Sequence, residues 1–262
     1  MTAMRRIFEK PQKGNPHRLR IKQHVWPKRS IERFVDAAGK VNLFDRARNK
    51  VRMAAADDDI FCAKRAWDQR AEIVTKSIED EFQGLADEII AAKVTILDPK
   101  QKASVDAFYA LWRARAEHRT TGADLTSLKN VTGHKWTKDQ EEDFEKHGVW
   151  FIREGGTMPD RFLRGFKIQR EIDALLPELS SAQWGIMRAQ AGHLIVPDHP
   201  GLSPIIPLTP MLCLCWGQTG TTSMPWQQVA VINRYLNLVG HQYVFAQNLT
   251  QCPLNPHALW PQ

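Results

Sequence analysis

The chain has few cysteines and no long apolar run, and each shortage excludes a class of protein. Its 262 residues include only four cysteines, and these are unevenly placed: Cys62, Cys213, Cys215 and Cys252. Small secreted domains held by disulfides carry many more, so we exclude a disulfide scaffold and expect a cytoplasmic location. No stretch approaches the roughly 18 consecutive apolar residues of a membrane span, and the N-terminus lacks a signal-peptide apolar core. We therefore expect no membrane partner.

The usual catalytic signatures are missing as well. The sequence has no GxSxG, P-loop, HExxH or GxGxxG motif, so serine-hydrolase, P-loop, zincin and Rossmann interpretations lose their support. Cys213 and Cys215 would share one face of a strand, and Cys252, His241 or His257 would complete a zinc tetrad. No second closely spaced cysteine pair supports that tetrad. The sequence argues against a zinc site and leaves another divalent metal ion open as a cofactor.

The chain does carry an excess of positive charge. It has 36 Lys and Arg residues against 29 Asp and Glu, a formal charge of +7 and a pI near 9.3. Residues 1–17 form a basic arm interrupted by prolines and glycine, with Arg5, Arg6, Lys10 and Lys13. Such an arm either contacts phosphates, releasing their counterions, or serves as a solubilising tail. Nucleic acid is the partner that this charge favours.

The first half of the chain combines a hairpin with several helices. Alternating apolar residues at 41–45 predict a strand, with a return strand around 50–53. Helical periodicity predicts a long helix over about 63–94 and a second helix that Asp98 and Pro99 cap. Two further helices are expected at 124–130 and 137–151, the latter with a capping box of Thr137 and Gln140. Another helix is expected around 161–176.

After Pro177 the pattern changes to strands, expected at 184–188, 193–196, 205–208, 212–216 and 242–245, with a small-residue loop at 217–223 and a helix at 225–239. We predict an α+β protein whose central mixed or antiparallel sheet is built from both chain ends. Residues 18–252 would be one domain with a helical insertion at about 57–176. Residues 253–262 would be a proline-rich tail.

The helix expected around 161–176 carries a second group of basic residues. Arg161, Arg164, Lys167 and Arg170 recur at helical spacing. We predict that they share an exposed face, which either binds a nucleic-acid substrate or is simply solvated.

Separated motifs give the chain a family resemblance. His24–Val25–Trp26–Pro27 with Phe34, then Asp198–His199–Pro200, Pro207–Leu208–Thr209–Pro210, and Ile232–Asn233 with Tyr243–Val244–Phe245 occur in that order. Together they resemble the bacterial domain-of-unknown-function family number four-two-three-eight, over about residues 21–247. Pro197 and Ser30 depart from its pattern, which usually has Ser and an aromatic residue there. Some members of that family occur among anti-phage genes, so the resemblance implies a role in defence.

The polar residues that these motifs share are His24, Asp198 and Asn233, and we expect them to form a catalytic site. His199, Glu79 and Tyr243 are candidate neighbours. A metal-dependent phosphodiesterase would gather carboxylates and imidazoles around a divalent ion. A metal-free enzyme would use His24 as a general base, with Lys or Arg stabilising the phosphorane. The expected function is a nucleic-acid-directed effector, a nuclease-like phosphodiesterase.

A non-catalytic alternative stays open. In a sensor or scaffold that binds nucleic acid or protein, His24 and Asp198 would pin the N-terminal segment onto the sheet through a buried hydrogen bond. The two functions differ in one observable, because a general base needs solvent access to the proton it takes. An open His24 favours the enzyme, and a buried, fully paired His24 favours the scaffold.

Overall fold

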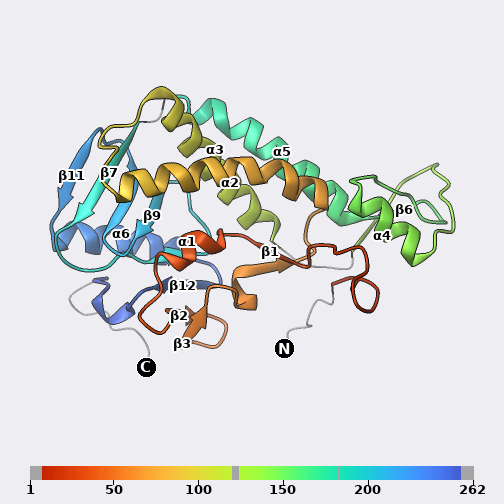
Figure 1. The fold of residues 1–262 in the computed structure, drawn as a ribbon, viewed down its shortest axis with the longest axis horizontal. Helices are drawn as coiled ribbons and strands as arrows, with labels where there is room; N and C mark the ends of the chain where they lie inside the picture. The colour runs from red at the N-terminus through yellow and green to blue at the C-terminus, as the bar shows by residue number, and fades with distance from the viewer. Residues whose placement is uncertain (1–7, 120–123, 182, 255–262) are drawn as a thin grey trace.

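The computed structural model describes residues 8–119, 124–181 and 183–254. Long helices run along the molecule, with the sheet that contains β7 and β9 at one end of them and the sheet that contains β2 and β12 below them (Figure 1), which confirms the predicted α+β class. The helices are α1 Lys28–Glu32, α2 Gln69–Ile90, α3 Pro99–His118, α4 Lys138–Lys146, α5 Asp160–Leu179 and α6 Trp226–Val239, and two short 3-10 turns are η1 Asp59–Phe61 and η2 Leu249–Gln251.

One sheet joins the two chain ends, as predicted. Its order is β3 (Lys50–Ala55), β2 (Lys40–Asp45), β12 (Tyr243–Ala246) and β8 (Val196–Pro197), and all its neighbours are antiparallel. The second sheet comes from the C-terminal part alone, in the order β11 (Thr221–Met224), β7 (Trp184–Ala189), β10 (Leu212–Trp216) and β9 (Ile205–Thr209), with β11 parallel to β7. A third pairing joins β1 (Lys22–His24) to β4 (Cys62–Lys64).

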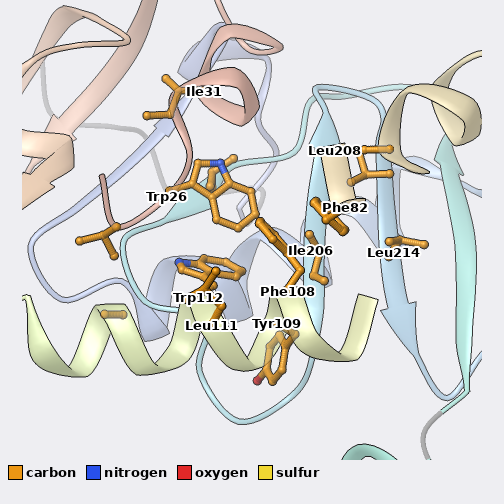
Figure 2. Packing of buried hydrophobic residues seen from close by; sticks show 14 of the residues in the cluster. Trp26, Ile31, Phe82, Phe108, Tyr109, Leu111, Trp112, Ile206, Leu208 and Leu214 are labelled. Atoms are coloured by element: carbon orange, nitrogen blue, oxygen red, sulfur yellow. The ribbon is translucent and has the colours of Figure 1, made fainter. Parts of the chain in front are cut away.

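Aromatic side chains fill the main core between the helices and the sheets. Trp26 lies against Trp112 of α3, with ring centroids 4.2 Å apart, and Phe82 of α2 stacks on Phe108 at 3.6 Å. Figure 2 shows these rings facing Ile206, Leu208 and Leu214 of β9 and β10. Burying a large apolar side chain stabilises a fold by roughly 1.5–3 kcal/mol, so Trp26 is a strong anchor for the chain beside His24.

The helical middle contains a small additional lobe. The strands β5 (Leu125–Ser127) and β6 (Thr157–Pro159) pair there beside α4, over a satellite core of Phe151, Met158 and Phe162. The predicted helix at 124–130 is therefore wrong, because pairing with β6 overrides local propensity. The predicted loop at 217–223 likewise contains the start of β11. The predicted cap of α3 by Asp98 with Pro99 and the predicted capping box of Thr137 with Gln140 in α4 are confirmed.

Both chain ends contact the domain where they are described. Gln12 donates its backbone N–H to Glu142 Oε1 of α4 at 2.8 Å, and His17 Nε2 lies 2.7 Å from Asp139 Oδ1. Pro253 and Leu254 are buried. The first seven residues of the predicted arm, and 255–262 of the predicted tail, lie outside the described residues. Within the described ranges, no helix is long and apolar enough to cross a membrane.

Candidate functional site

The alternation of strand β1 orients His24. In a strand, successive side chains point to opposite faces, and Gln23 points inward, fully buried, accepting from the backbone N–H of Ala66 at 2.7 Å and donating to Trp67 O at 2.9 Å. Lys22 and His24 therefore share the opposite face. The buried Trp26, two residues on, fixes the chain on the other side of His24. Its position is thus set by neighbours in the core.

Opposite His24 lies a network centred on a buried arginine. Glu72, Thr75 and Glu79 share one face of α2 because they are three or four residues apart. Arg115 of α3 is 2% exposed and reaches Glu79 Oε1 at 2.5 Å, Thr75 Oγ1 at 2.8 Å and Glu72 Oε1 at 3.8 Å. It also donates to the backbone oxygen of His24 at 3.3 Å. One guanidinium therefore joins α2, α3 and β1.

His24 and this network line a pocket of about 380 Å³. Five basic side chains and three carboxylates surround it, which leaves a formal excess of two positive charges. The lining residues are Arg20, Lys22, His24, Pro27, Lys28, Arg29, Glu72, Glu79, Asp80, Gln83 and Arg115. Some of these cations are only loosely held: Lys28 Nζ lies 3.6 Å from Glu32, and both side chains are about half exposed. Exposed pairs of this kind contribute little, so Lys28 is free to exchange partners.

The imidazole of His24 is oriented on one side and open on the other. Its Nε2 lies 3.2 Å from the backbone oxygen of Ala56. Because that oxygen only accepts hydrogen bonds, Nε2 must carry the proton that it donates. Nδ1 has no hydrogen-bond partner among the described residues, and the side chain lines the pocket. Burial lowers the pKa of His24 below its ordinary value of 6.5. A neutral ring with an accessible lone pair is the form a general base requires.

Asp198 occupies a different environment. Its Oδ2 accepts from Arg119, the C-cap of α3, at 2.9 Å, and its Oδ1 accepts from the backbone N–H groups of His241 at 2.7 Å and Gln242 at 3.1 Å. The residue is 2% exposed. Arg119 continues to Ile60 O at 2.9 Å. Both carboxylate oxygens are therefore engaged in holding β12 and α3 together.

The other expected site residues do not gather in one place. Asn233 is fully buried and bonds only backbone groups, accepting from Ile195 N at 3.0 Å and donating to His193 O at 2.7 Å. Among the described contacts, no hydrogen bond joins His24, Asp198 and Asn233. Of the candidate neighbours, Glu79 lies with His24. The candidates His199 and Tyr243 lie beside Asp198, since His199 is adjacent in sequence and the Asp198 N–H donates to Tyr243 O at 3.2 Å. The shared catalytic role of the three remains a prediction.

The predicted exposed basic face on α5 is wrong for two of its four members. Arg161 is buried and pairs with Glu145 Oε2 at 2.7 Å and Glu9 Oε2 at 2.6 Å. Arg164 is buried too, and it pairs with Asp124 and Asp160. Lys167 and Arg170 are exposed. The folding of the α4 lobe against α5 covers one side of the helix, so the four side chains do not form one surface.

The Glu9 carboxylate is surrounded by basic side chains. It lies 2.6 Å from Arg153, 2.6 Å from Arg161 and 2.7 Å from Lys138. Burial raises the pKa of this carboxyl, but the opposing effect of Arg161 and the other cations outweighs it and holds the pKa well below the ordinary value of 4.5. Glu9 thereby ties the N-terminal segment to the α4 lobe.

Replacing Glu9 by Gln is expected to lower the free energy of unfolding by about 2 kcal/mol at pH 7, within the range for a hydrogen bond to a charged group. Because the folded-state pKa is depressed, this contribution is fully present above the unfolded pKa and is lost as pH falls through the folded one. The gap between parent and Glu9→Gln should thus shrink from pH 5 downward. Urea unfolding at several pH values measures it, and a gap independent of pH would contradict this account.

Other parts of the surface fit a polyanion less well. A hollow of about 440 Å³ between α3 and α5 has the three carboxylates Glu117, Glu171 and Glu178 in its wall against the single arginine Arg113, and this excess of negative charge would repel phosphates. A shallower one of about 680 Å³ balances three arginines against three aspartates: Arg46, Arg48, Arg52, Asp45, Asp58 and Asp59. In the described part of the chain, no group of three or more His, Cys, Asp or Glu side chains is placed to hold a metal ion. All four cysteines are buried and free.

Arg115 is the residue of this site that sequence reasoning missed. Basic residues near the C-terminal end of a helix interact favourably with its dipole, so an arginine at this position does not by itself indicate a buried network. The usable signal is its spacing, four residues after Leu111 and three after Trp112, which places a guanidinium on the apolar stripe. A charge in that position needs buried partners.

Comparisons with known proteins add nothing to this geometry. No family model, no curated protein and no solved structure matches the chain. The resemblance to the bacterial family named above therefore remains a prediction, and the function must be argued from the site.

Proposed function

We propose that the chain is a nucleic-acid-directed, nuclease-like phosphodiesterase whose general base is His24. The observation that carries the proposal is the open Nδ1 of an oriented imidazole in a pocket with excess positive charge. Cations around a phosphodiester attract it and stabilise the charge that develops in the transition state. The resemblance to a family with members among anti-phage genes supports a place in bacterial defence.

Activity should depend on His24. The substitution His24→Gln keeps a donor for the Ala56 oxygen but removes the base, so cleavage of labelled RNA or DNA should fall about 10²- to 10⁴-fold. The same change at His147, the C-cap of α4, whose side chain is 61% exposed, is the matched control and should leave the rate unchanged. Because burial lowers the pKa of His24, kcat/KM should rise with pH and level off with a midpoint below 6.5. Equal activity of His24→Gln and parent would reject the proposal.

A non-catalytic binding module is the second candidate, and the complete pairing of Asp198 favours it. There the motifs would hold the fold while basic side chains bind nucleic acid or a protein. That function predicts salt-sensitive binding without products, because neutralised phosphates release counterions. Electrophoretic shifts at rising salt, run beside the cleavage assay, separate it from the enzyme.

A further inference from the structure

The His24 pocket offers one uncommitted base. Glu72 Oε2 is held by Arg20 at 2.7 Å, and its Oε1 accepts from Trp67 Nε1. Glu79 Oε1 is held by Arg115, and Asp80 pairs with Lys76 at 2.5 Å. Each carboxylate of the pocket has at least one cation as its partner, although the exposed Asp80–Lys76 pair is weak, whereas Nδ1 of His24 has no protein partner among the described residues.

Because the pocket offers a single base, it limits which nucleophile can attack the phosphorus. Hydrolysis by water needs a base and also groups that hold the water in line with the leaving oxygen. In RNA the 2′-hydroxyl is already fixed beside the phosphorus, and such intramolecular placement is worth effective concentrations of about 10⁵–10⁸ M. DNA lacks this hydroxyl. One oriented imidazole with cations nearby therefore suits a reaction in which the 2′-oxygen of RNA attacks the adjacent phosphorus.

We propose, building on the function above, that the substrate of this pocket is RNA and that Lys28 acts as the general acid. His24 Nδ1 takes the proton of the 2′-hydroxyl while the bond from O2′ to phosphorus forms. The bond from phosphorus to O5′ breaks, and the leaving oxygen takes a proton from the Lys28 ammonium. The products are a 2′,3′-cyclic phosphate and a 5′-hydroxyl, and no other reactant is consumed.

The placement of Lys28 supports its role. It opens α1 four residues after His24, lines the same pocket and has only a half-exposed partner, Glu32, at 3.6 Å. When a leaving oxygen takes the place of Glu32 beside Lys28, little free energy is lost, because an exposed ion pair of this kind contributes little. Both the Lys28–Glu32 and the Arg29–Asp87 pairs are exposed, but Arg29 is in closer contact with Asp87 than Lys28 is with Glu32, so Lys28 is the more available of the two.

The substrate is tested with three labelled oligonucleotides of one sequence, incubated with the full chain in EDTA and in magnesium. These are RNA, DNA, and RNA with a single 2′-O-methyl group. We expect RNA to be cut to fragments with 2′,3′-cyclic phosphate and 5′-hydroxyl ends, DNA to stay intact, and the methylated position to be skipped. Cut DNA, or fragments with 5′-phosphates, would overturn this inference and leave the phosphodiesterase standing. No cleavage of either polymer would overturn both.

The general acid is tested separately. Lys28→Met should slow cleavage of ordinary RNA about 10²- to 10⁴-fold. Substrate with sulfur in place of the leaving O5′ needs no proton, so the variant should cut it nearly as fast as the parent. Arg29→Met on the same helix is the control and should not show this selective rescue. Equal slowing of both substrates by Lys28→Met would reject Lys28 as the acid.

Discussion

Replacing Asp198 by alanine is expected to lower the free energy of unfolding by about 3–5 kcal/mol, the range for breaking a buried ion pair. The change leaves Arg119, whose side chain is 10% exposed, without its carboxylate partner. It also removes the acceptor of the His241 and Gln242 N–H groups. Buried donors without partners are costly because they have already lost water.

Urea unfolding of Asp198→Ala measures this loss. Asp143→Ala is the matched control, because Asp143 is 52% exposed and pairs only with histidines, so it should change stability by less than about 1 kcal/mol. A well-folded Asp198→Ala variant that lost cleavage alone would contradict the structural role and return Asp198 to the catalytic set.

Replacing Arg115 by methionine is expected to cost a similar amount, about 3–5 kcal/mol. Methionine keeps much of the volume but leaves Glu72 and Glu79 without their shared cation, in a site where their side chains are 8% and 23% exposed. Thermal and urea unfolding should both show the loss. Arg113→Met, two residues earlier on the same helix, should have little effect.

A double variant makes the test of Arg115 sharper. If the stranded carboxylate is what destabilises Arg115→Met, then Arg115→Met with Glu79→Gln should lose less than the two single losses combined, because groups in contact are coupled. Strict additivity would show that the loss in Arg115→Met does not come from Glu79, and would leave Glu72, Thr75 and the packing on Trp67, whose ring lies 5.5 Å away, as its sources.

Local signals made much of the fold predictable. The cap of Asp98 with Pro99 and the capping box of Thr137 with Gln140 involve residues no more than three apart, so they can be recognised without tertiary contacts. The β2–β3 hairpin follows from alternation in the same way. The β5–β6 pair could not be recognised, because its partners, from Leu125 with Pro159 to Ser127 with Thr157, are far apart in sequence and neither strand alternates clearly.

The site was predictable only in part. The motif around His24 marked a residue that does line a pocket, but no local pattern relates His24 to Asp198, and the structure gives each its own arginine from α3. The buried arginines of α5 show the same limit. Arg161 has the spacing of a surface residue, and only its contacts with Glu145 and the distant Glu9 show that it is covered.

The sheet shared by the chain ends has a consequence for synthesis on the ribosome. Asp45 of β2 pairs with Tyr243 of β12, so the N-terminal hairpin leaves the exit tunnel long before the strand that completes its sheet. At translation rates of roughly 5–20 residues per second, β2 waits about 10–40 s with an open edge. An unpaired edge strand is a template for association with other chains. The nascent protein should therefore depend on a chaperone that shields β2 until β12 emerges.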